Sequence, residues 1–174
     1  MTYANIYSKG ILKKLYNFNS QSTDEVPKDA NSKTKSIHHW GGPKTRLALH
    51  AIYTLSFICL LRSDEALKIR RQDIELVQED DQTVYMIVTL PFRKTHQDGR
   101  AFFLKAKIHS CTDAFMTEIQ PFYIYPLDDD EEHLCPVRAM AEWINASQVT
   151  SGCMFRKFTA HDRPSDLEDA PMVR

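Results

Sequence analysis

The sequence predicts a mainly α-helical protein with a small antiparallel β-hairpin or sheet, which is an α+β fold. Residues 47–61, LALHAIYTLSFICLL, are apolar nearly all round, as is typical of a helix buried on most sides. Two stretches rich in β-branched and aromatic residues, 83–92 and 101–108, flank the turn signal Asp98-Gly99 and predict a hairpin. The length of 174 residues is enough for one domain with its own core.

The N-terminal part is expected to stand apart from this body. Residues 3–18 carry apolar side chains at helical intervals with lysines between them, which predicts a short amphipathic helix. Residues 19–36 are polar and contain a proline, so they are expected to form a flexible linker. We therefore divide the chain into residues 1–43, a helix and a flexible basic linker, and residues 44–174, the folded body.

Further helices are expected after the buried one. Ser63 can cap a short helix, DEALKI, whose first turn contains two acids that suit the helix dipole. A helix is predicted from about Thr112 to Gln120, and another opens at Pro136 with VRAMAEWINA. The acidic stretch 128–132 is expected to be a loop between them, and the polar residues 159–174 a tail that follows the body.

Composition and charge narrow the class of protein. The four cysteines lie far apart, which indicates no disulfide framework and a reducing compartment. The longest apolar run has 15 residues and includes His50, short of the roughly 20 needed to cross a bilayer, and the N-terminus lacks a signal-peptide core. A soluble intracellular protein without membrane contact is expected. Residues 1–75 have a balance of +5 and residues 76–174 of −6, so the first part is the one suited to an anion.

Three segments in order carry a resemblance to a known family. LLRSDEALKIRRQDIEL, residues 60–76, resembles the first-arginine box of the tyrosine recombinases, or phage-type integrases, in which a turn with an aspartate leads into a strand. LPFRKTHQDGR, residues 90–100, is similar to that family's lysine-bearing hairpin, and HLCPVRAMAEWI, residues 133–144, resembles a segment of fungal transposon-like members. GCMFRKF, residues 152–158, is placed like the stretch before the second catalytic box. The resemblance covers residues 44–158 and implies a partial tyrosine-recombinase catalytic domain.

The resemblance also implies roles for particular residues. Enzymes of this family break a DNA phosphodiester with a tyrosine nucleophile, and arginines neutralise the phosphate while a lysine acts as general acid. Carried onto this sequence, Arg62 is the first phosphate-binding arginine, Glu65 orients its surroundings, and Lys94 is the candidate general acid. DNA-binding residues expected beside them are Lys44, Arg46, Arg93, Thr95 and His96.

Partners and cofactors follow from the same resemblance. The family chemistry uses no metal or nucleotide, so no cofactor is expected, and His133 and Cys135 lack the second close pair of a zinc site. The expected partner is the phosphate backbone of duplex DNA, with the chain itself or a fuller recombinase chain as a further partner. Such a partner implies a nuclear location.

The sequence lacks the motifs that follow these segments in the family, an H-x-x-R box and a nucleophilic tyrosine. None of the seven histidines is followed three residues later by an arginine, and no tyrosine lies beyond Tyr125. We therefore expect a truncated or decayed member from a mobile element, a DNA-binding remnant or fragment inactive alone. Two alternatives stay open: a protein-interaction module that keeps the fold, and a fragment to which a partner chain donates the second arginine and the tyrosine. Arg62 could also form an ordinary surface ion pair with Glu65, and Lys94 could be a solvated turn lysine.

Overall fold

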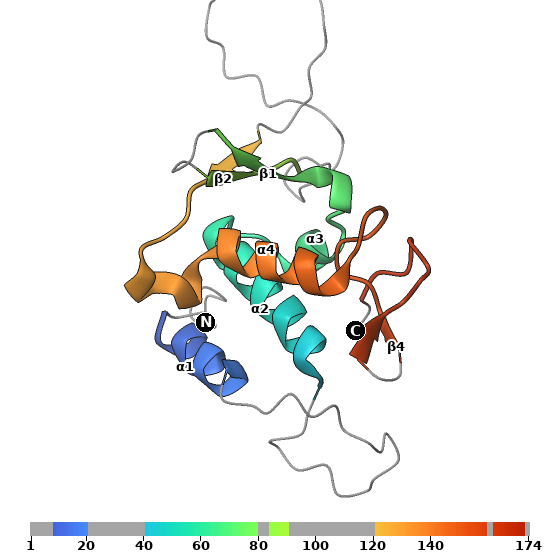
Figure 1. Cartoon of the computed structure of the whole chain (residues 1–174), viewed down its shortest axis with the longest axis horizontal. Helices are drawn as coiled ribbons and strands as arrows, with labels where there is room; N and C mark the ends of the chain where they lie inside the picture. Colours follow the sequence, from blue (N-terminus) through green and yellow to red (C-terminus); the bar gives the residue numbers. More distant parts are fainter. Residues whose placement is uncertain (1–8, 21–40, 80–83, 91–120, 160–161, 173–174) are drawn as a thin grey trace, which may run out of the picture.

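The structure is a computed structural model that describes residues 9–20, 41–79, 84–90, 121–159 and 162–172. In Figure 1 a small antiparallel sheet lies against helices α2 and α4, and α1 packs at the far end of this helical layer. The α+β class predicted from the sequence is confirmed at this coarse level. The elements in chain order are α1 (Lys9–Ser20), α2 (Pro43–Ile58), α3 (Ser63–Leu67), η3 (Arg71–Asp73), β1 (Ile74–Gln78), β2 (Val84–Val88), β3 (Phe122–Ile124), η5 (Asp129–Leu134), α4 (Pro136–Ser147), β4 (Phe158–Thr159) and β5 (Arg163–Pro164).

Helices α2 and α4 form the centre of the core, as their sequences predicted. Both begin with a proline in the first turn, where the missing N–H costs no helical hydrogen bond. Ala48, Ala51 and Leu55 of α2 and Met140 and Trp143 of α4 are all buried in one apolar cluster. The buried helix predicted at 47–61 therefore exists, four residues earlier at its start and three residues shorter at its end.

The larger sheet has the order β1-β2-β3 and is antiparallel throughout. Along β2, Met86 and Val88 point into the core and alternate with residues that face outward, the period-2 pattern of a half-buried strand. β2 pairs with β1 over its whole length and with β3 at residues 86–88. The partners described for β2 are therefore β1 and β3. That strand, its turn at 93–99 and the helix predicted at 112–120 lie outside the described residues.

The first helix is part of the body and not a separate arm. Leu12 of α1 is buried, and Lys9 forms an ion pair at 2.8 Å with Glu131 in η5. The acidic stretch expected to be a loop is thus largely the 3-10 helix η5, on which α1 rests. The division of the chain at residue 43 coincides with the start of α2, but it does not separate two independent units.

The polar tail is also part of the fold. Strands β4 and β5 pair antiparallel, and Met172 donates its backbone N–H to the carbonyl of Phe155. The side chain of Asp162 accepts hydrogen bonds from the backbone N–H groups of Lys44 at 2.6 Å and Thr45 at 2.9 Å. These two N–H groups belong to the first turn of α2 and have no hydrogen-bond acceptor within the helix. The negative charge of the carboxylate is also favourable at the positive end of the helix dipole. The tail predicted to follow the body is thus joined to it, because a carboxylate can accept hydrogen bonds from the first turn of a helix that is distant in sequence.

Replacing Asp162 by alanine is expected to lower the free energy of unfolding by about 1 to 2 kcal/mol, the usual cost of losing a helix cap. The measurement is urea-induced unfolding, compared with Asp166→Ala, which changes an exposed aspartate nearby in sequence. Asp162→Asn should lose less, because an asparagine side chain still accepts a hydrogen bond. Equal stability of the Asp162→Ala variant and the wild-type protein would show that the cap contributes nothing.

Candidate functional site

The first arginine box begins at a sharp turn between α2 and α3. Leu60 adopts a left-handed conformation with φ of 52°, and the backbone N–H of Leu61 donates to the carbonyl of Ser56 at 3.0 Å. This is the hydrogen bond of a Schellman ending, in which the left-handed position is usually glycine. A leucine there costs of the order of 1 kcal/mol. The strained turn reverses the chain and places Arg62 at the start of the next helix.

Arg62 occupies the position before the first residue of α3, which the sequence assigned to Ser63. The reason is Glu65, whose Oε2 accepts the backbone N–H of Arg62 at 2.9 Å. This is the glutamate half of a capping box, and it leaves Ser63 as the first helical residue. Glu65 is only 6% exposed, so its contact with the Arg62 backbone is shielded from water. Glu65 therefore orients the turn through the main chain.

The guanidinium of Arg62 is exposed at this helix end, as expected. The surface ion pair with Glu65 that the spacing allowed does not form, and Arg62 has no ion pair with any residue in the described ranges. By contrast, Arg70 pairs with Asp169 at 3.0 Å, and Arg138 pairs with Asp129. Arg62 thus presents a planar cation to solvent from a fixed backbone position.

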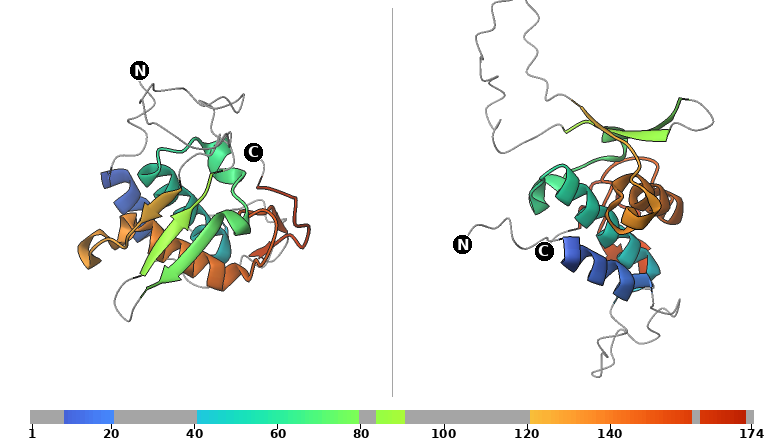
Figure 2. Two further views of the ribbon diagram at one scale, coloured as in Figure 1. Left: turned by 90° about the horizontal axis from the view of Figure 1, so that it is seen from above. Right: turned by 90° about the vertical axis from the view of Figure 1, so that its left-hand side faces the viewer.

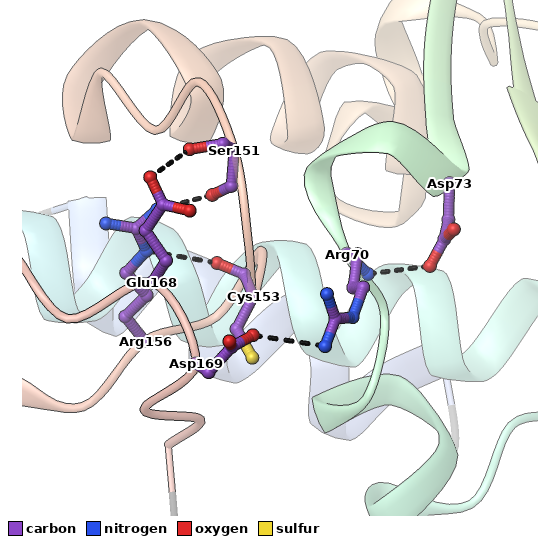
Figure 3. A network of polar contacts seen from close by, with 7 residues as sticks. All are labelled: Arg70, Asp73, Ser151, Cys153, Arg156, Glu168 and Asp169. Carbon is purple, nitrogen blue, oxygen red and sulfur yellow. Dashed lines mark hydrogen bonds and ion pairs between the residues drawn. The ribbon is translucent and has the colours of Figure 1, made fainter.

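A polar network joins the segment after α3 to the C-terminal part of the chain (Figure 3). Asp73 accepts the backbone N–H of Arg70 at 2.8 Å and closes the turn η3, which leads into β1 as the resemblance implied. Burial raises the pKa of Asp73, although its hydrogen bond with Arg70 acts in the opposite sense. On the other side, Cys153 forms a β-bridge with Arg70 and donates its N–H to Glu168 at 2.7 Å. Residues 151–156 and 168–169 therefore support the arginine box.

Arg156 is a charged residue whose role the sequence did not reveal. It is buried, and its guanidinium donates to the backbone carbonyls of Cys153 and Ser165, each at 3.3 Å, and of Ser151. These acceptors are main-chain carbonyl groups of loops. Every residue has such a group, so the sequence does not show which ones will bind an arginine. Arg156 therefore organises the C-terminal loops and does not face solvent as a second phosphate-binding arginine would.

The predicted DNA-binding residues fall into three groups. Lys44 is half-buried in the first turn of α2. Arg46, further along the same helix, is only 6% exposed, and this burial removes it from the surface contacts available to a phosphate. Its assignment as a DNA contact stays a prediction, against which this burial speaks. The remaining predicted residues lie outside the described ones: Arg93, Lys94, Thr95 and His96.

A second group of ionisable residues lies where α1 meets α2 and η5. The Nε2 atom of His50 is 3.3 Å from the carbonyl oxygen of His133, and the ring of Tyr16 lies 5.0 Å from that of His50. Burial lowers the pKa of His50, so it is a neutral packing residue near neutral pH. Cys135 is buried and its sulfur accepts the N–H of Leu127. Within the described ranges no three metal-ligating side chains gather as a candidate metal site.

No family model, curated protein or solved structure matches this chain. In the described parts of the structure, no helix has the length and apolar character required to cross a membrane.

Proposed function

We propose that these 174 residues are a DNA-binding remnant or fragment of a tyrosine recombinase, in which Arg62 binds a phosphate of duplex DNA. The observation that supports this most directly is the exposed guanidinium of Arg62, which is fixed through its backbone by Glu65 and has no ion pair among the described residues. A guanidinium offers paired donors to phosphate oxygens, and its charge is always present. The ordered resemblance of the three sequence boxes supports the same assignment.

On this proposal the chain binds DNA but does not cut it alone. The 174 residues contain no H-x-x-R box and no tyrosine after Tyr125 to act as the usual nucleophile of such enzymes. Arg156, the arginine nearest to where the second box would follow, holds loop carbonyls and is buried. In an intact enzyme of this kind, Arg62 would neutralise charge on the scissile phosphate, Glu65 would hold Arg62 in place, and Lys94 would protonate the leaving oxygen.

Binding to a labelled duplex is expected to weaken with salt in proportion to the phosphates contacted. Four predicted cations stay available once Arg46 is excluded: Lys44, Arg62, Arg93 and Lys94. The plot of log K against log salt should then have a slope of about −3 to −4, at about −0.9 for each phosphate neutralised. Fluorescence anisotropy between about 50 and 200 mM salt measures it. Arg62→Ala should reduce the magnitude of the slope by about 0.9, and the double variant Arg93→Ala/Lys94→Ala by up to about 2.

Arg138→Ala is the matched control, because it removes an arginine that already pairs with Asp129 and lies on α4, outside the network of Figure 3. Its slope should equal that of the wild-type chain. If the wild-type protein does not bind at low salt, or if Arg62→Ala and Arg138→Ala change the slope equally, the phosphate-binding role of Arg62 is wrong. Binding to unrelated duplex sequences should be equal, since phosphate contacts carry no sequence information.

A non-catalytic protein-interaction module is the second candidate function. One observation favours it: the outer face of the sheet exposes aromatic side chains among acidic ones. Such a face suits a protein partner better than a DNA backbone.

A further inference from the structure

The outer face of the three-stranded sheet carries a group of tyrosines. Tyr123 and Tyr125 are 60% and 58% exposed, although Ile124 between them is buried. In β2, Tyr85 precedes the core residue Met86 and so points to the outer face. The ring of Tyr85 lies 6.2 Å from that of Tyr123 and 5.5 Å from that of Tyr125. These three residues form one surface, which we call the tyrosine face.

On the described strands, the charged groups that face outward beside the tyrosine face are acidic. Glu75 of β1 pairs with Ile87 of β2, and both side chains lie at positions that face outward from the sheet. Glu79 follows the end of β1 and is exposed. Burial raises the pKa of Tyr85, and the charges of Glu79 and Glu75 raise it further, which agrees with carboxylates close to the ring. At the outward-facing positions of β1, β2 and β3, as far as the structure describes them, no lysine or arginine occurs.

A hollow of about 420 Å³ adjoins the tyrosine face at Tyr125. Its lining includes Leu127 and the carboxylates of Asp128 and Asp129. Arg138 also lines it, but that guanidinium is hydrogen-bonded to Asp129 and lies 3.9 Å from Glu132. Two carboxylates therefore offset the single positive charge, and the hollow continues the acidic character of the face.

The described helices leave this surface uncovered. Figure 2 shows α2 and α4 on one side of the sheet, and no described helix on the other. We propose that the tyrosine face binds a cationic peptide segment of a protein partner. Arginine or lysine side chains of that segment would lie over the rings of Tyr85, Tyr123 and Tyr125, where cation–π attraction is available, with Glu75 and Glu79 as counter-charges.

The acidic charge of the tyrosine face favours a cationic peptide over a second copy of the chain and over a single-stranded nucleic acid. A symmetric pair of copies joined through this face would bring Glu75 and Glu79 toward their own equivalents, and like charges across an interface are unfavourable. A single-stranded nucleic acid could stack bases on tyrosines, but the carboxylates would repel its phosphates. A cationic peptide meets both the rings and the acids favourably. This inference is independent of the proposed role of Arg62.

The test is the binding of fluorescein-labelled hexa-arginine to the full chain, measured by fluorescence anisotropy. Hexa-citrulline, whose side chain has nearly the shape of arginine without the charge, should bind much more weakly. The double variant Tyr123→Ala/Tyr125→Ala should weaken hexa-arginine binding about fivefold to thirtyfold, from two exposed cation–π contacts. Both side chains are largely exposed, so the variant is expected to stay folded, and circular dichroism checks this.

A matched pair of charge variants separates this face from general attraction to an acidic protein. Glu75→Gln/Glu79→Gln removes two charges from the face, whereas Asp64→Asn/Asp166→Asn removes two exposed charges elsewhere. Only the first pair should weaken binding clearly. Equal losses in the two pairs, unchanged binding by the double tyrosine variant, or equal binding of hexa-citrulline would each overturn the proposal. So would tyrosine-dependent binding of oligo-dT, or a tyrosine-dependent dimer in sedimentation experiments, because each assigns the face to another occupant.

Discussion

Replacing Trp143 by alanine is expected to lower the free energy of unfolding by about 3 to 5 kcal/mol, the usual cost of removing a large aromatic side chain from a core. Trp143 of α4 is 0% exposed and its ring lies 6.3 Å from that of Phe155 and 5.9 Å from that of Phe158. Its Nε1 also donates to the carbonyl of Met154 at 3.1 Å. The substitution removes both the contacts and the hydrogen bond.

Urea unfolding followed by circular dichroism measures this loss without relying on tryptophan fluorescence. Trp143→Phe is the matched control, because it keeps an aromatic ring and removes the N–H donor. We expect it to cost about 1 to 3 kcal/mol, the penalty for leaving the buried carbonyl of Met154 without a partner, plus a small packing term. A loss below about 1 kcal/mol for Trp143→Ala would mean that α4 does not hold the C-terminal segment through this residue.

Gly152→Ala is expected to be the next most damaging change, at about 2 to 5 kcal/mol in total from a conformational and a steric cost. Gly152 has φ of 68°, a left-handed conformation that costs a side-chain-bearing residue about 1 to 2 kcal/mol. A methyl group there would also overlap the backbone carbonyl of Glu168, which cannot rotate away. Relieving that overlap shifts the loop and adds about 1 to 3 kcal/mol.

Gly41→Ala distinguishes the two causes of the Gly152 effect. Gly41 has a similar φ of 61°, but a methyl group there would meet the side chain of Thr45 at 3.1 Å, which has more freedom to adjust than a backbone carbonyl. Gly41→Ala should therefore cost mainly the conformational part, about 1 to 2 kcal/mol. If the two alanine variants are equally stable in urea, the contact between Gly152 and Glu168 is not tight in solution.

Both predictions concern the seam drawn in Figure 3, where residues 151–156 and 168–169 meet the turn within the arginine box. Met154 donates its N–H to the carbonyl of Ile69 at 2.9 Å, and Arg71 donates to Gly152 at 2.8 Å. Because Ile69 lies shortly after Arg62, loosening the seam should disturb the candidate phosphate site as well. The C-terminal segment is therefore a support of that site.

The helical core was predictable because its signals are local. The apolar run that became α2 and the Pro136 start of α4 reflect periodicity and proline chemistry within each segment. The helix start near Arg62 was also visible, but the sequence assigned the cap to Ser63. Glu65 decided otherwise, because its buried carboxylate accepts the backbone N–H one position earlier.

Long-range contacts were the part that sequence reasoning missed. Asp162 caps α2 across more than a hundred residues, and Arg156 binds three loop carbonyls, yet both read as ordinary polar residues in the chain. Arg46 was expected at the surface because nothing in its neighbours in the sequence shows which side of α2 is buried. The predicted general acid Lys94 and its neighbours lie outside the described residues, so that half of the candidate site stays a prediction.

The sequence by itself determined helices α1 to α4, the strand at 84–88 and the resemblance that assigns Arg62 and Glu65, because each depends on residues close together in the chain. Only the tertiary structure decided which charges are available. It buried Arg46, paired Arg70 with Asp169 and left Arg62 exposed without an ion pair among the described residues. It also exposed the tyrosine face. The physical reason is that burial and ion pairing depend on which distant segments come into contact. The order of residues along the chain does not directly show these contacts.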